Sequence, residues 1–173
     1  MYDAAGNKVT LAGLTGTVAT GHILLNLTNA SANAGVIYGG GNAVAPTSTH
    51  WSVGTHETVN DDRYDYISML FSSVNGISKV DKYEGNGNAS GPTVTLGFQP
   101  RLILIKATET TGNWIIIKVT GTGTTNNNGG YLDTTGTFYN AAYVDVTSTG
   151  FSITDNGSEV NQDGKNYIYY AHA

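Results

Sequence analysis

The chain has 173 residues, a net charge of −5, no cysteine and 12% charged residues, against roughly 25% in a typical soluble domain. The missing cysteines exclude disulfides and thiolate metal sites, and eight scattered Lys and Arg residues form no basic patch for nucleic acid. No stretch approaches the roughly 20 apolar residues of a membrane span, and the N-terminus lacks the basic start and apolar core of a signal peptide. We therefore expect neither a nucleic-acid partner nor a membrane partner.

Short apolar runs rich in β-branched and aromatic residues predict strands along the chain. The first run is DYISMLFS, residues 65–72. The runs at 101–107 and 113–120 predict a hairpin in the middle of a sheet, because both are apolar at nearly every position. Residues 142–147 and 166–173 predict two further strands. Helical periodicity is absent from the long windows, so strands dominate the prediction.

Asn-Gly and Asp-Gly pairs predict the turns, because both Asn and Gly tolerate the positive φ of tight hairpins. The pairs begin at Asn75, Asn86, Asn128, Asn156 and Asp163. One pair falls in GTGTTNNNGG, residues 121–130, which we expect to be a flexible loop. With 23 glycines and regular turn spacing, the sequence predicts an all-β fold, an antiparallel β-sandwich of jelly-roll-like type.

A phrase occurs twice, as TSTHWSV at 47–53 and TSTGFSI at 147–153. Trp51 and Phe151 hold the same place in the two phrases, as do Val53 and Ile153. Repeats of this kind indicate related structural units. We therefore expect the Trp51 and Phe151 rings to fill equivalent positions in two related β units.

The match continues beyond the phrase, where residues 59–73 align with residues 160–173. Asn60 aligns with Asn161, Tyr66 with Tyr167 and Ile67 with Ile168. The front half of the second copy has no counterpart before residue 20. We therefore predict a partial β repeat with an N-terminal extension at 1–76 and a complete β-sandwich repeat at 77–173.

The segment from residue 77 to 118, together with the end of the chain, resembles a domain that recurs in tail-fibre and other virion proteins of bacteriophages, particularly marine ones. The matching positions are Tyr83, Gly85, Asn86, Gly87, Leu96, Gly97, Phe98, Pro100, Lys106, Trp114, Gly150, Phe151, Asn161, Gly164 and Tyr167. The resemblance covers 77–173 fully and 20–76 as a partial copy, with 71–80 as the junction between copies. It implies a virion-surface or fibre role and carries no known chemistry.

At several of these positions the type of residue has a physical explanation. Gly97 can take a conformation closed to other residues, and Pro100 precedes a strand, where its missing N–H does little harm. Phe98, Trp114 and Phe151 are large apolar side chains, and we expect all three to be core anchors.

No set of residues in the sequence predicts a catalytic or metal site. His50 and His56 could share a strand face with Glu57 nearby, but their spacing lacks a metal-binding signature, and a solvated loop is the favoured reading. Residues 155–164 lack the order of calcium ligands and are better read as turn formers. Asp133, Asp145 and Glu109 are conceivable acids for sugar cleavage, but nothing in the sequence brings them together. We expect no catalytic residue, metal or cofactor.

Tyrosines are the most suggestive candidates for a binding surface. In the last strand Tyr167 and Tyr169 share one face and Tyr170 takes the other, with one face in the core. The other face could stack sugars or pack against a neighbouring subunit. The residues that we predict to bind a ligand are Tyr139, Tyr143, Tyr169, Asn126 and Asn127.

These observations predict a non-enzymatic virion structural protein, part of a phage tail fibre or surface appendage built of tandem β modules. The alternatives are a carbohydrate- or receptor-binding module at a fibre tip, or a self-polymerising extracellular filament subunit completed by strand exchange. The expected partners are further copies of the chain, forming a homo-oligomer, or other virion proteins, with host surface glycans as possible ligands. The expected location is the virion or the extracellular space.

Overall fold

The computed structural model describes residues 21–22, 25, 28–29, 32–33, 53–54, 57–124, 127–140 and 142–173. The predictions for Trp51, His50, His56 and Asn126, and for residues 1–20, lie outside this part of the chain. Its secondary structure elements are β1 (Gly21–His22), β2 (Ala32–Asn33), α1 (Glu57–Asn60), β3 (Ser78–Glu84), β4 (Thr93–Thr95), β5 (Leu102–Ala107), β6 (Ile115–Val119), β7 (Asn127–Tyr131), β8 (Tyr139–Asn140), β9 (Val144–Thr147), β10 (Gly150–Ile153) and β11 (Asn166–His172). No helix among the described residues has the length and apolar character needed to cross a bilayer.

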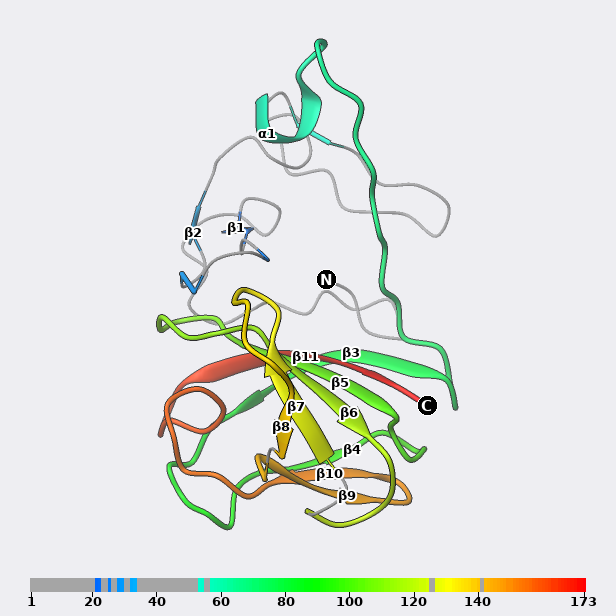
Figure 1. The fold of residues 1–173 in the computed structure, drawn as a ribbon, viewed down its shortest axis with the longest axis vertical. Helices are drawn as coiled ribbons and strands as arrows, with labels where there is room; N and C mark the ends of the chain where they lie inside the picture. The colour runs from blue at the N-terminus through cyan, green and yellow to red at the C-terminus, as the bar shows by residue number, and fades with distance from the viewer. Residues whose placement is uncertain are drawn as a thin grey trace.

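Two antiparallel sheets face each other across a core, which confirms the all-β sandwich. The larger sheet has the order β3-β11-β5-β6-β7-β8, and the smaller has the order β4-β10-β9. In Figure 1 the larger sheet lies above the smaller one, and α1 is a single turn far from both. Jelly-roll-like connectivity stays a prediction.

Alternation along the strands builds the core between the sheets. In β5 and β6, Ile103, Ile105, Ile115 and Ile117 are fully buried, and the residues between them lie on the other face. The smaller sheet contributes Val144, Val146, Phe151 and Ile153. Because side chains alternate between faces in a strand, one row of each strand fills the space between the sheets.

The predicted hairpin at 101–107 and 113–120 is confirmed as β5 and β6. The two strands are antiparallel, with Ile103 opposite Ile117 and Ile105 opposite Ile115. Both strands lie inside the sheet, with β11 on one side and β7 on the other. The long apolar runs therefore correctly indicated central strands.

The predicted core anchors differ in burial. Phe151 is fully buried and Phe98 is nearly so. Trp114 is only half-buried, so its prediction as a core anchor is wrong. It precedes β6 by one residue, and strand alternation places it on the face away from the buried Ile115.

Most of the Gly-marked turns are as predicted. Gly76, Gly87 and Gly164 have φ of 72°, 64° and 66°, the left-handed region that glycine enters at little cost. Gly97, with φ of 84°, also takes the conformation expected of it.

The predicted turn at Asn128-Gly129 and the predicted loop at 121–130 are wrong in part, because β7 begins at Asn127. Asn128 lies opposite Lys118, and Gly129 lies opposite Ile117. Backbone pairing with β6 therefore overrides the local turn preference of Asn-Gly.

The predicted strand at 65–72 is also wrong, because these residues form no strand. The aligned residues of the two copies consequently have unlike surroundings: Ile67 is 98% exposed, whereas Ile168 in β11 is 9% exposed. Tyr66 is likewise exposed and Tyr167 is fully buried. The difference has a physical cause, since β11 is paired with both β3 and β5, whereas residues 65–72 form no ladder with any strand of the described chain.

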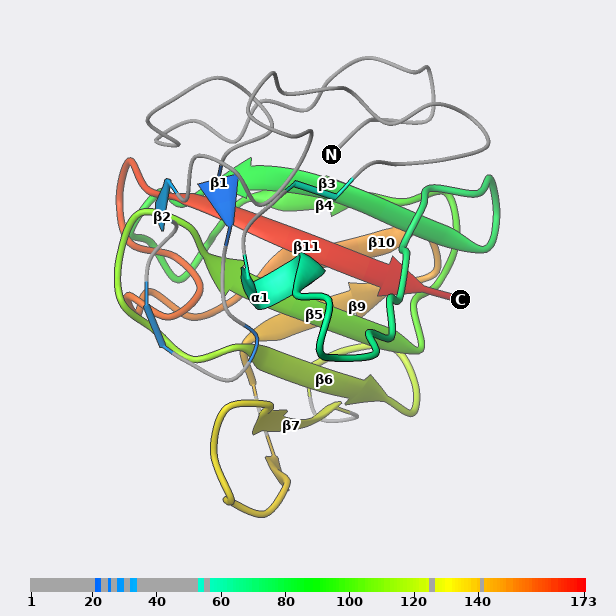
Figure 2. The same cartoon turned by 90° about the horizontal axis from the view of Figure 1, so that it is seen from above.

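The face of the larger sheet turned away from the smaller sheet, called here the outer face, receives contacts from the N-terminal part of the chain. The Thr28 carbonyl accepts hydrogen bonds from Gly112 N (2.8 Å) and from Lys106 Nζ (3.3 Å). Lys106 is fully buried and also donates to the Ala107 carbonyl at 3.1 Å. Figure 2 looks onto this face, with β1 and α1 drawn over β11 and β5.

Candidate functional site

Three tyrosine side chains meet at the β7–β8 end of the larger sheet. Tyr131 ends β7, Tyr139 begins β8 and Tyr143 immediately precedes β9. The Tyr143 hydroxyl lies 2.8 Å from the Tyr139 hydroxyl and 3.1 Å from the Tyr131 hydroxyl. The structure thus brings together Tyr139 and Tyr143, two of the residues predicted to bind a ligand, and adds Tyr131.

A carboxylate anchors this group. Glu159, from the segment between β10 and β11, accepts hydrogen bonds at Oε2 from Tyr131 (3.0 Å) and Tyr143 (3.4 Å). Its Oε1 accepts a bond of 2.7 Å from the Asn113 amide, which lies between β5 and β6. We call these five residues, Asn113, Tyr131, Tyr139, Tyr143 and Glu159, the tyrosine cluster.

Each tyrosine hydroxyl of the tyrosine cluster can donate its proton to another member of the cluster. A relay in which Tyr139 donates to Tyr143, Tyr143 to Tyr131 and Tyr131 to Glu159 uses all three protons. A phenol carries only one O–H donor, so no donor is left for a ligand. The tyrosine cluster therefore holds the β7–β9 region to the segment around Glu159.

The pKa values of the tyrosines agree with this internal role. Burial, followed by the hydrogen bond with Tyr139, raises the pKa of Tyr131 to about 12. The pKa of Tyr143 is raised further, first by burial and then by its bonds to the other two hydroxyls. Both phenols are neutral at physiological pH and keep the protons that they donate within the tyrosine cluster.

The other residues predicted to bind a ligand are not at a surface. Tyr169 is 3% exposed and its ring meets the Phe151 ring edge-on at 5.7 Å in the core. Asn127 is 1% exposed, and its amide donates to the carbonyls of Gly123 (3.0 Å) and Val144 (2.9 Å). Neither side chain can contact a ligand, so these two predictions need correction. The prediction for Asn126 lies outside the described residues.

Alternation explains the position of Tyr169. Tyr167 and Tyr169 share one face of β11, as predicted, and that face is the core. Tyr170 takes the outer face, where its ring lies 4.8 Å from the Phe71 ring. The pattern of the strand predicted which tyrosines share a face, and the position of the second sheet decided which face is buried.

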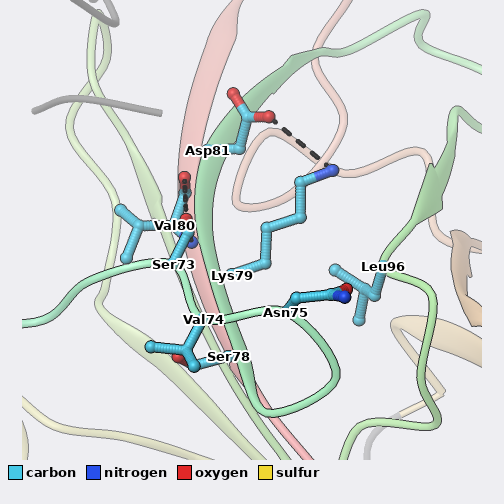
Figure 3. Close-up of a pocket in the computed structure, with 8 residues that line it drawn as sticks. All are labelled: Ser73, Val74, Asn75, Ser78, Lys79, Val80, Asp81 and Leu96. Atoms are coloured by element: carbon cyan, nitrogen blue, oxygen red, sulfur yellow. Dashed lines mark hydrogen bonds and ion pairs between the residues drawn. The ribbon is translucent and has the colours of Figure 1, made fainter. Parts of the chain in front are cut away.

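A shallow pocket lies between the first half of β3, the residues just before it, and Leu96, which follows β4 (Figure 3). The Ser73 hydroxyl accepts a bond from Val80 N (3.0 Å) and donates to the Val80 carbonyl (3.3 Å). Across the pocket, Lys79 Nζ donates to the Thr95 carbonyl of β4 at 2.9 Å and lies 3.9 Å from Asp81. These side chains cap backbone groups at the edges of β3 and β4 that could otherwise template another strand.

Residues 64–77, called here the apolar connector, are the most exposed apolar stretch of the described chain. Its exposed large side chains are Tyr64, Tyr66, Ile67, Met69, Leu70, Phe71, Val74 and Ile77. It has no charged residue after Asp65. Figure 1 shows it rising from β3 as a single extended segment toward α1. Patches of this kind are uncommon on isolated monomers and mark sites of association.

Sequence reasoning missed Glu159 and Asn113 as members of the tyrosine cluster. Glu159 was read only as a turn former within 155–164, and Asn113 only as the start of a strand. Glu159 lies far in sequence from the tyrosines that it contacts, and Asn113 lies far from Glu159, so no local pattern connects them.

Comparisons with known proteins place the chain by family alone. The search of curated proteins and the search of solved structures each found no match. Residues 2–173 match the model of a family described as Domain of unknown function (DUF7483). Because this match spans nearly the whole sequence, the chain belongs to the DUF7483 family.

Proposed function

We propose that this chain is a non-enzymatic structural protein of a bacteriophage virion, part of a tail fibre or surface appendage built of tandem β modules. The resemblance of residues 77–173 to virion domains motivates the proposal. Several motif positions have fold-making roles: the Tyr83 ring stacks on the Tyr167 ring at 5.1 Å, and Gly87 and Gly97 have positive φ.

The apolar connector is the observation that carries the proposal. Fully burying one large apolar side chain is worth about 1.5–3 kcal/mol, and Ile67, Met69 and Leu70 are largely exposed to water. Residues 66–73 are extended, carry no charge and belong to no strand, so their backbone is also open to pairing with another strand. Further copies of the chain or other virion proteins would cover it, as assembly into a fibre requires.

Sedimentation velocity over a range of concentrations tests the assembly. We expect the wild-type chain to associate and a double variant, Ile67→Ser with Met69→Ser, to remain monomeric. Leu132→Ser serves as the control, because Leu132 is an exposed apolar residue outside the apolar connector. A wild-type chain that stays monomeric at every concentration would contradict the proposal. Growth without limit would favour the filament alternative over a defined oligomer.

A labelled antibody against the chain tests the location. We expect it to decorate the tail fibres or surface appendages of phage particles whose genome encodes this sequence. Purified particles that lack the chain would rule out a virion role, whatever its behaviour in solution.

A second candidate function is carbohydrate or receptor binding. Two aromatic rings near β8 favour it, since Phe138 and Tyr139 are 55% and 36% exposed. Aromatic rings in this position can stack on a ligand while remaining part of a folded sheet.

A further inference from the structure

A hollow on the outer face lies over β6 and β7 and is lined by Lys118, Asn128 and Phe138. We call it the outer hollow. Its volume is about 370 Å³, within the range of roughly 300–1,000 Å³ for small-molecule sites. It lies on the opposite face of the larger sheet from the tyrosine cluster, because Lys118 and Asn128 face away from the buried Ile117 and Gly129.

Phe138 lines the outer hollow with an aromatic ring whose face is turned toward the sheet. A Cβ placed on Gly130 would lie 3.6 Å from three ring atoms of Phe138 at once. Equal distances to three ring atoms mean that the ring face is turned toward Gly130, with room for a methyl group between the ring and the backbone. The opposite ring face points to solvent, and Phe138 is 55% exposed. An exposed aromatic face of this kind offers a ligand a surface on which to stack.

Two polar side chains stand beside this ring with unused hydrogen-bonding capacity. Lys118 and Asn128 are direct cross-strand partners, and both are exposed. Neither forms an ion pair or a side-chain hydrogen bond with any other described residue. They differ in this from the tyrosine cluster, in which every hydroxyl proton is already bound.

The geometry points to a carboxylated sugar unit of a surface glycan as the ligand of the outer hollow. The negative π face of Phe138 attracts the C–H groups on the apolar side of a sugar ring. The Lys118 ammonium suits a carboxylate, and the Asn128 amide can both donate to and accept from hydroxyl groups. This inference rests on the second candidate function, which it deepens by naming the site and the ligand class.

A single outer hollow binds weakly because it is shallow and open to water. We expect a dissociation constant on the order of 1 mM, about −4 kcal/mol. Several copies on one fibre would multiply this affinity by engaging one glycan surface together.

Titration of the full-length chain with free glucuronic acid and with glucose, followed by nuclear magnetic resonance, tests the site. We expect wild type to prefer glucuronic acid, and Phe138→Ala to weaken binding of both sugars at least about tenfold. Phe71→Ala is the matched control, because Phe71 is 54% exposed on the apolar connector. Lys118→Gln should remove the preference for glucuronic acid over glucose.

The outcomes separate this site from the functions on which it rests. Binding that Phe138→Ala and Phe71→Ala leave equally intact would overturn the outer hollow but not carbohydrate binding elsewhere. If wild type binds neither of these two sugars nor any member of a glycan array, the second candidate function fails together with the site. An unchanged preference in Lys118→Gln would overturn the carboxylated ligand. None of these results bears on assembly through the apolar connector.

Discussion

Asn161 has the largest number of side-chain bonds among the described residues. Its Nδ2 donates to Asn88 O (2.7 Å), Asp155 O (2.9 Å) and Asn86 Oδ1 (3.2 Å). Its Oδ1 accepts from Asn86 N at 2.8 Å, and the side chain is fully buried. One amide thus joins the turn after β3 to the segment before β11. Asn60, its counterpart in the sequence alignment, is exposed and donates only to the Gly54 carbonyl.

The substitution Asn161→Asp tests this role. The carboxylate that it introduces would face the carbonyl oxygens of Asn88 and Asp155, and we expect a loss of about 3 kcal/mol in unfolding free energy at neutral pH. Burial among acceptors would raise the pKa of this carboxyl above its unfolded value of about 4. Its stabilising contribution would therefore be present below pH ~4 and lost as the pH rises.

Urea unfolding at several pH values measures the effect, with wild type compared at each pH. Asn88→Asp is the matched control: Asn88 is exposed and uses only its Oδ1, which accepts from Ser90 N at 3.0 Å. We expect this control to change stability by no more than about 0.5 kcal/mol. Equal losses in the two variants would show that Asn161 is not the centre of this network.

The buried tyrosines predict that the folded protein loses stability at alkaline pH. Burial raises the pKa of Tyr83, Tyr143 and Tyr169, and raises the pKa of Tyr131 to about 12. A phenol with a raised pKa stabilises the fold fully below the unfolded value of about 10, and this contribution is lost as the pH rises toward the folded pKa.

Tyrosinate absorbance and circular dichroism, recorded together from pH ~9 upward, test this limit. We expect the β signal to persist while the buried tyrosines remain neutral. Ionisation of the buried tyrosines should coincide with unfolding. Complete ionisation of all tyrosines near pH ~10 in a folded chain would contradict the burial described here.

At the scale of elements, the close approach of β10 to β4 depends on a glycine. A Cβ on Gly150 would collide with the carbonyl oxygen of Val94, which lies opposite Phe151 in β4. The clash involves backbone on both sides, so rotation of a side chain cannot relieve it. Gly150 is one of the positions of the virion-domain resemblance, and this packing explains why a glycine is needed there.

We therefore expect Gly150→Ala to lower the unfolding free energy by about 3 kcal/mol or to prevent folding. Gly112→Ala is the control, because its Cβ would meet only the Ala107 side chain at 3.9 Å. That change should stay within about 0.5 kcal/mol. Thermal or urea unfolding of both variants provides the comparison, and a Gly150→Ala protein as stable as the control would contradict the packing of β10 on β4.

The contrast between β11 and the apolar connector shows how far a strand depends on its neighbours. Both contain a Tyr-Ile pair in a similar sequence, at 66–67 and 167–168. β11 pairs along its length with β3 and with β5, whereas the connector makes only the Val74–Ser78 bridge at its end. Strand propensity is therefore realised only where flanking backbone satisfies the hydrogen bonds.

At the scale of the whole molecule, the two sheets of the sandwich and the core between them lie within residues 77–173. The strands from β3 to β11 all fall in this range, as does every residue of the core. The division into two repeats at residue 76 stays a prediction, as does independent folding of the two parts. The contacts that cross the boundary include Thr28 with Lys106 and Gly112, Phe71 with Tyr170 and Ser73 with Val80.

We expect a fragment of residues 77–173 to fold cooperatively with β-type circular dichroism. Its unfolding free energy should be lower by about 2 kcal/mol, because a few hydrogen bonds and one ring contact are lost. A 77–173 fragment that fails to fold would show that the sandwich needs the N-terminal part and would argue against the division at residue 76.

The amino-acid sequence alone determined the all-β class, the central β5–β6 hairpin and the turns at Gly76, Gly87 and Gly164, because these depend on local alternation and on backbone freedom. Tertiary structure alone decided that Asn128-Gly129 lies in a strand and which face of β11 enters the core. It also decided that Glu159 binds the tyrosine hydroxyls and that the Phe138 ring faces Gly130. Each of these features depends on a partner brought close by sheet pairing or by the approach of the second sheet, and local sequence carries no record of such a partner.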